Sequence, residues 1–165
     1  MKADQKREEL IVLTDVIRVL ASNTETNDEY AVFEENVPPL GGPPPHMHPD
    51  EEVFYIVKGE FEFVLNDLQN PFKALRGSVV HVPSNALHTF KNVGNTPGKM
   101  VVFLSPGKLL DYFRVIGSKT DVNTELPDLT KVPDFSKLDV SKVFEYAAEH
   151  NVQFVLPEVI TDQVN

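Results

Sequence analysis

The chain has no cysteine among its 165 residues, which excludes disulfide bonds and thiolate metal ligands. It is also poor in positive charge, because 15 Lys and Arg stand against 25 Asp and Glu and give a net charge of −10. An acidic balance of this kind argues against nucleic acid and anionic lipid surfaces as partners. Apolar runs reach only about five residues, as at residues 100–104, whereas a membrane-spanning helix needs about 20. We therefore expect no nucleic acid and no membrane among the partners.

The composition is otherwise that of an ordinary globular domain. Hydrophobic residues make up 41% of the chain, and 165 residues are enough for one domain with a substantial core. The first residues, MKADQKREEL, lack the apolar stretch of a secretory signal. Together with the absence of cysteine, this predicts a cytoplasmic protein.

Short β-branched or alternating segments, separated by Gly, Pro and Asn, fill most of the chain. We expect strands near residues 10–20, 30–37, 51–58, 60–66, 72–75, 78–82, 88–93, 99–104 and 152–156. Many short strands at near-regular spacing are typical of a sandwich or a closed barrel.

The apolar residues change to helical spacing after residue 105. Ser105 and Pro106 have the residue types of a helix N-cap and a first helical position, and Gly117 is suited to end that helix. A second helix is expected over residues 140–149. The sequence therefore predicts a β-structure followed by two short helices.

Two histidines one residue apart, His46 and His48, precede an acidic cluster and an apolar run. Side chains two residues apart in an extended chain point to the same face, so both imidazoles can approach one point. Glu52 has the same parity as the two histidines. Two imidazoles and a carboxylate on one face form half of a site for a divalent metal.

A third histidine, His88, follows the turn at residues 83–85 and precedes a short alternating strand. With it the set comprises three nitrogen ligands and one oxygen ligand. Such a set suits Fe, Mn, Co, Ni, Cu or Zn better than Ca or Mg, which prefer oxygen ligands throughout. The pattern therefore predicts one divalent transition metal as cofactor, without selecting among these metals.

These two blocks resemble the two motifs of the cupin superfamily. The first motif is a glycine, five residues, His-x-His, three or four residues, Glu, six residues and Gly, and the second is Gly, five residues, Pro-x-Gly, two residues, His, three residues and Asn. The positions that fit are His46, His48, Glu52 and Gly59 in the first motif, and Gly77, Pro83, His88 and Asn92 in the second. The motifs cover roughly the central third of the chain, and together they are a specific signal.

The chain departs from the family pattern at two glycines. Leu40 occupies the place of the leading glycine, because Gly41 lies four rather than five residues before His46. Asn85 occupies the place of the middle glycine in the second motif. Asn is the residue besides glycine that best tolerates a left-handed backbone, so we expect Asn85 to adopt that conformation at little cost.

The resemblance implies an all-β fold, the cupin double-stranded β-helix or jelly-roll barrel, with two short C-terminal helices. It implies one domain over residues 1–165, with a barrel core at about 9–105 and a helical tail at 106–165. It also implies homodimer formation, since terminal strands of cupins often pair between subunits. The metal ligands that it implies are His46, His48, Glu52 and His88.

Three apolar side chains are candidates for a substrate pocket. Phe54 and Ile56 share parity with Glu52, and Phe90 shares parity with His88, so all three are expected to face the barrel interior. They either surround a bound substrate or fill the core, because in a small barrel the two spaces coincide.

Other polar and aromatic groups have simpler interpretations. His81 is expected to be a partly buried or surface histidine of a strand rather than a group that supports a metal ligand, and His150 suits the C-terminal end of a helix. Asp50 and Glu51, next to the ligand candidate, are expected to be solvated. The apolar helix face at residues 112–116 either covers the mouth of the barrel or packs outside the sheet.

The whole chain resembles small single-domain cupins that are similar to quercetin dioxygenase. This implies a metal-dependent oxygenase that acts on a small aromatic or enolic substrate, with Glu52 as both ligand and catalytic base. The alternatives are a non-enzymatic cupin that binds a small molecule as sensor or carrier, and a metal-dependent isomerase of a sugar or keto acid. An open, aromatic-lined cavity would favour the oxygenase, whereas a polar cavity with Arg or Lys pointing in would favour a sugar or acid ligand.

Overall fold

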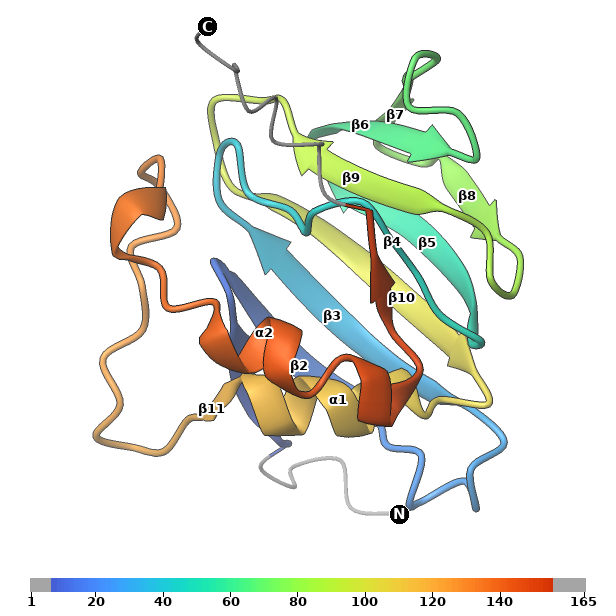
Figure 1. Cartoon of the computed structure of the whole chain (residues 1–165). Coiled ribbons are helices and arrows are strands. Elements are labelled where there is room, and N and C mark those ends of the chain that lie inside the picture. Colours follow the sequence, from blue (N-terminus) through green and yellow to red (C-terminus); the bar gives the residue numbers. More distant parts are fainter. Residues whose placement is uncertain (1–6, 156–165) are drawn as a thin grey trace, which may run out of the picture.

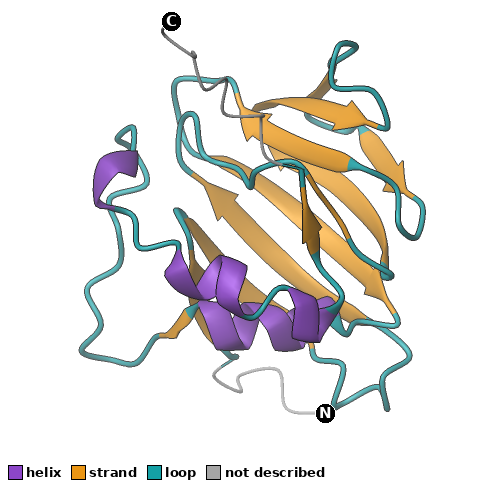
Figure 2. Ribbon diagram, in the orientation of Figure 1, coloured by secondary structure: helices purple, strands orange, loops and turns teal. Residues whose placement is uncertain are grey.

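The computed structural model describes residues 7–155, which form two facing antiparallel β-sheets and a set of short helices (Figures 1 and 2). The larger sheet has the order β11 (Ser118–Lys119), β1 (Glu9–Val12), β2 (Asp15–Ala21), β3 (Ala31–Val37), β10 (Gly98–Ser105), β5 (Glu51–Lys58) and β8 (Val79–Val82). The smaller sheet has the order β12 (Gln153–Phe154), β4 (His46–Met47), β9 (His88–Asn92), β6 (Glu60–Leu65) and β7 (Phe72–Leu75). The helices are α1 (Leu109–Ile116) and α2 (Ser141–Glu145), with single 3₁₀ turns at Phe135–Lys137 and Ala148–His150. The predicted jelly roll with two short C-terminal helices is therefore confirmed.

Alternation along the strands decides which side chains form the core between the sheets. On β10, Met100, Val102 and Leu104 are fully buried, while the residues between them are more exposed. Rings from the other strands fill the same space, and Phe54, Phe63 and Phe90 lie with centroids 5.2 to 5.8 Å apart. Edge-to-face and tilted pairs at this distance stabilise a core beyond their area burial alone.

The smaller sheet covers only part of the larger one, and α1 and α2 lie over the part formed by β2 and β3 (Figure 1). Leu109, Leu110 and Tyr112 are the buried residues of α1, and they pack into the core between the sheets. Phe113 meets Phe33 of β3 edge to face at 5.8 Å. The helices thus close one side of the space between the sheets.

The first helix begins later than the sequence predicted. Ser105 is the last residue of β10, a cis peptide bond precedes Pro106, and the helix starts at Leu109. Its start is set by Asp50, whose Oδ2 accepts hydrogen bonds from the backbone N–H of Gly107 at 2.8 Å and of Leu109 at 3.2 Å. The prediction that Asp50 is solvated is therefore wrong, because this carboxyl is buried and caps a helix from another segment.

The second helix is shorter than expected. It covers Ser141–Glu145, and a separate 3₁₀ turn at Ala148–His150 follows in place of its last residues. The turn ends at Asn151, which has the left-handed backbone conformation expected of a C-terminal cap, with φ of 57°.

The strands from β1 to β10 run from Glu9 to Ser105. The prediction that one domain spans the whole chain, with a core at about 9–105 and a tail at 106–165, stays a prediction. Both of its ends, residues 1–6 and 156–165, lie outside the described residues.

Candidate metal centre

The predicted ligands come from both sheets and meet between them. His46 of β4 and His88 of β9 are direct partners in the smaller sheet, and His48 follows β4 by one residue. Glu52 lies on β5 of the larger sheet. One ring nitrogen from each histidine lies within 4.8 Å of the other two, and Glu52 Oε2 lies 3.0 Å from His88 Nε2 and 3.5 Å from His48 Nε2. The structure therefore brings all four side chains together.

The turn before His88 connects the two sequence motifs. Asn85 has φ of 59°, which confirms the left-handed conformation expected at this glycine position. Its backbone N–H donates a 2.8 Å hydrogen bond to the carbonyl of His48. Leu40, at the other glycine position of the family, also has a left-handed backbone, with φ of 63°. Both positions at which the family pattern has glycine thus have a left-handed backbone in this chain, although neither residue is glycine.

Backbone carbonyls orient two of the imidazoles. His46 Nδ1 lies 2.9 Å from the carbonyl of Pro44, and His88 Nδ1 lies 2.9 Å from the carbonyl of Ala86. A carbonyl only accepts, so each Nδ1 carries the proton in these bonds. The lone pair of each Nε2 is then left free, which is the arrangement that metal-binding histidines usually show.

The buried nitrogens facing this site lack hydrogen bonds in the described part of the chain. They are both ring nitrogens of His48 and Nε2 of His88. His88 Nε2 and Glu52 Oε2 are close, but their arrangement is not that of a hydrogen bond. Buried polar atoms are normally paired, so these nitrogens need an explanation. One divalent cation would take the lone pairs of His88 Nε2 and of one ring nitrogen of His48, and the residues therefore fit the metal that the motifs predicted.

The charge states of the site suit a cation. Burial raises the pKa of Glu52, but the imidazoles of His48 and His88 lower it by more, so the carboxyl stays ionised. Burial, followed by its two histidine neighbours, lowers the pKa of His46 to about 3 and keeps it neutral. Burial also lowers the pKa of His88, yet the carboxylate of Glu52 raises it overall.

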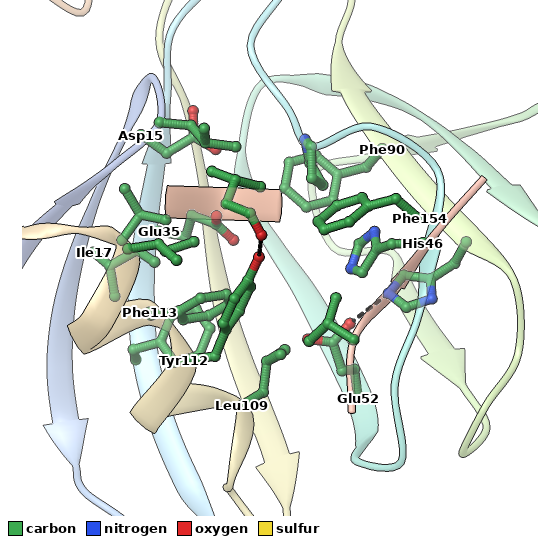
Figure 3. Close-up of a pocket in the computed structure, with 18 of the residues that line it drawn as sticks. Asp15, Ile17, Glu35, His46, Glu52, Phe90, Leu109, Tyr112, Phe113 and Phe154 are labelled. Atoms are coloured by element: carbon green, nitrogen blue, oxygen red, sulfur yellow. Dashed lines mark hydrogen bonds and ion pairs between the residues drawn. The ribbon is translucent and has the colours of Figure 1, made fainter. Parts of the chain in front are cut away.

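A partly enclosed cavity of about 60 Å³ adjoins the cluster (Figure 3). His46, Glu52 and His88 form one wall, and Phe54 and Phe90 line it as well. Ile56, the third predicted pocket residue, is fully buried in the core and is not among the lining residues. The described residues around this cavity include no Lys or Arg, and most are aliphatic or aromatic.

Helix α1 contributes directly to this cavity. Tyr112, Phe113 and Ile116 are among its lining residues, which supports the interpretation that this face covers the barrel mouth. The Tyr112 hydroxyl donates to the carbonyl of Val143, and burial raises its pKa to about 12. Tyr112 is therefore an uncharged lining residue, and its hydroxyl already donates its hydrogen bond to Val143.

The remaining histidines lie away from the cluster. His81 is exposed on β8, as expected, with Glu51 as its neighbour across the strand pair. The ring of His150 lies 5.5 Å from that of Tyr112 at the end of a 3₁₀ turn. Both positions agree with the structural interpretation rather than a role as ligand.

Two acidic residues of the cavity were missed by the sequence interpretation. Asp15 and Glu35 lie on the strands opposite the histidine cluster (Figure 3). The signal was present, because Glu35 alternates with Ala31, Phe33 and Val37 on the inner face of β3. A carboxyl in such a position contradicts the apolar pattern and indicates either a buried partner or a ligand.

Two facing antiparallel sheets form a jelly roll, and the histidine cluster between them is a candidate metal site. Residues 33–104 match the model of the cupin domain family. An RmlC-like cupin from Shewanella frigidimarina superposes with a TM-score of 0.54 at 20% identity, covering 64% of this chain and 88% of that chain. Residues 33–104 are therefore a cupin domain, as the two sequence motifs predicted.

Two curated relatives match a shorter stretch. Protein SchB of Streptomyces halstedii is 34% identical over 62 residues, which are 37% of this chain and 44% of that protein. Polyketide synthase CurC of Streptomyces cyaneus is 39% identical over 62 residues, which are 37% of this chain and 39% of that protein. The match thus spans less than half the length of either relative.

None of the helices in the described part of the chain has the length and apolarity to cross a bilayer.

Proposed function

We propose that the protein is a metal-dependent oxygenase that acts on a small aromatic or enolic substrate. The observation that carries this proposal is the cavity, in which imidazoles and the Glu52 carboxylate face a space with mostly aliphatic and aromatic walls, two further acidic residues on the far side, and no described Lys or Arg. A sugar acid or keto acid would need a cationic or strongly polar wall. An aromatic enol needs an apolar one, with a basic group near its hydroxyl.

The proposed ligands are His46, His48, Glu52 and His88, and together they would hold one divalent transition metal. Four protein ligands leave one or two positions open on a five- or six-coordinate ion, as catalytic sites require. When bound, such a metal supplies Lewis acidity and, if it is redox-active, one-electron chemistry with dioxygen.

Glu52 is the proposed catalytic base. It is ionised at neutral pH, because His48 and His88 hold its pKa low, so it carries no proton of its own where a substrate enol would deliver one. The rings of Phe54, Phe90 and Phe113 line the space where the substrate would lie. They exclude bulk water, which strengthens the electrostatic interactions of the carboxylate within the cavity.

The name of one relative agrees with this substrate class. Polyketide synthase CurC matches at 39% identity over 62 residues. Polyketides carry carbonyl groups on alternating carbons, which enolise readily and become phenols on cyclisation. A small phenol or a 1,3-dicarbonyl compound is therefore the first substrate to test.

The test is oxygen uptake by protein loaded in turn with Fe, Mn, Co, Ni or Cu, with a flavonol and an enolic diketone as substrates. Glu52→Gln should keep most of the metal, because three imidazoles remain, but lose at least about 100-fold in turnover with the general base. His48→Ala should lose metal and activity together, and His81→Ala, at the exposed histidine, should change neither.

Absence of oxygen uptake with every metal would overturn the oxygenase. The non-enzymatic binding protein would then be the leading function, and a thermal-shift screen of small anions and sugars would test it. The cytoplasmic location and the homodimer stay predictions.

A further inference from the structure

The cavity wall opposite the histidine cluster carries two buried carboxyls. Asp15 of β2 and Glu35 of β3 are only 5% and 7% exposed. Glu35 pairs with Ile17 in the sheet, and Asp15 lies two residues before Ile17 on the same face, so both carboxyls point into the cavity. In Figure 3 they lie on one side of the space, and His46 and Glu52 lie on the other.

The carboxyls of Asp15 and Glu35 are close enough that each shifts the pKa of the other, and a single proton between them would join them. Thr14 Oγ1 donates a hydrogen bond of 2.8 Å to Asp15 Oδ1. Burial raises the pKa of Asp15 to about 7, and burial together with the charges of Asp15 and Glu52 raises the pKa of Glu35. The proton therefore stays mainly on Glu35, and the pair carries up to one negative charge at neutral pH.

Nothing in the described part of the chain neutralises this charge. Neither carboxyl has an ion pair with a described Lys or Arg, and the Tyr112 hydroxyl is directed to Val143 instead. A buried acidic pair without a cation destabilises the fold, and two apolar side chains would pack there at lower cost. Buried ionisable groups with shifted pKa values and no charged partner are concentrated at functional sites, where a ligand supplies the partner.

We propose that Asp15 and Glu35 bind a hydroxyl group at the end of the substrate that is distant from the metal ligands. This inference rests on the proposed function, because it takes the histidine cluster as the anchor for the other end. The Asp15 carboxylate accepts a hydrogen bond from the hydroxyl, and the Glu35 proton remains between the two carboxyls. The substrate is thus an uncharged polyhydroxylated aromatic or enol, and simple carboxylates are repelled.

The size of the cavity constrains this substrate. A volume of about 60 Å³ holds a few water molecules, whereas pockets for drug-sized ligands measure about 300–1,000 Å³. An aromatic substrate with two fused rings is larger than this volume, so its binding must displace lining side chains. Phe154 is suited to move, because it belongs to β12, which pairs with β4 over only two residues.

The experiment measures binding to the zinc-loaded protein, because Zn²⁺ has no redox chemistry and turnover cannot interfere. Two pairs of probes share a metal-chelating hydroxyketone, and only one member of each pair has additional hydroxyl groups. Quercetin is compared with 3-hydroxyflavone, and kojic acid with maltol, by isothermal titration. Oxalate serves as the carboxylate probe.

The wild-type protein should bind the hydroxylated member of at least one pair about tenfold more tightly, the effect of one hydrogen bond to a charged group. Asp15→Leu/Glu35→Leu should remove most of that preference and keep the affinity for 3-hydroxyflavone or maltol. Glu34→Gln, on the same strand but paired outward with Arg18 and Lys99, should leave the preference unchanged. If the double variant does not fold, Asp15→Asn replaces it in the same titration, because it removes the charge of the carboxylate and should reduce the preference for the hydroxylated probe.

An unchanged preference in the folded variants, tighter binding of oxalate than of the hydroxylated probes, or no binding of any probe would overturn the assignment. Oxygen uptake is a separate measurement. A protein with the expected selectivity but no turnover would refute the oxygenase and leave the role of Asp15 and Glu35 in binding intact.

Discussion

Replacing Asp15 with asparagine should stabilise the metal-free protein at neutral and alkaline pH. Burial raises the pKa of Asp15 to about 7 from its ordinary 3.8, although hydrogen bonds from Thr14 and Glu35 offset part of the effect. Each pKa unit corresponds to about 1.4 kcal/mol, so the ionised carboxyl destabilises the folded chain by on the order of 4 kcal/mol at pH 8. Asn has the same shape and can still accept from Thr14, but it carries no charge.

The destabilisation by Asp15 should increase as the pH rises. A carboxyl whose pKa is raised in the folded state holds its proton there while the unfolded chain has released its own. Its contribution to stability therefore falls as the pH rises from 3.8 to about 7. The gain from Asp15→Asn should be about 1–2 kcal/mol at pH 5 and about 2–3 kcal/mol larger at pH 8.

Urea unfolding of chelator-treated protein at pH 5 and pH 8 measures this difference as a change in midpoint at constant slope. Glu34→Gln is the matched control, because it removes a carboxylate from the exposed side of the neighbouring strand. That change should shift the free energy of unfolding by less than about 1 kcal/mol at either pH. A destabilised Asp15→Asn at pH 8, or an equal shift at both pH values, would refute the argument from burial.

Two other predictions concern the metal and a turn. Because Glu52 raises the pKa of His88 despite its burial, a metal must displace a proton from this imidazole at low pH, so added zinc should raise the melting temperature more at pH 7.5 than at pH 5. Equal increases would argue against histidine ligation. Leu40→Gly should stabilise the protein by up to about 1 kcal/mol, because Leu40 is 47% exposed with φ of 63°, a backbone that glycine adopts without strain. Leu40→Ala keeps the Cβ atom and should give no gain in the same urea titration.

The strands and the histidine cluster could be predicted because their signals are local, whereas the jelly roll itself was predicted from the resemblance to the cupin motifs. The spacing of His46, His48 and Glu52 needs only the two-residue repeat of a strand and a short turn, and Asn85 adopts the left-handed turn that its residue type favours. Alternating apolar residues located the strands for the same reason.

The sequence did not predict contacts that depend on register and on distant segments. Asp50 caps a helix that begins more than 50 residues later, so its burial follows from how β5 and α1 are packed. Glu35 interrupts an apolar alternation that is visible in the sequence, but its partner Asp15 is defined only once β2 and β3 are aligned. A polar residue on an apolar strand face therefore indicates a site before the partner can be named.

The strand β12 has a consequence for the rate at which a ligand can bind. Phe154 lines the cavity and pairs with His46, and β12 is held to β4 by a ladder of only two residues. A short terminal ladder opens far more often than the core of the sheet. If a substrate enters when β12 separates, its association rate constant is the diffusional value multiplied by the open fraction, and the observed rate reaches a plateau at high ligand concentration. The C-terminal strand would then set the residence time of the ligand, while the composition of the cavity sets its identity.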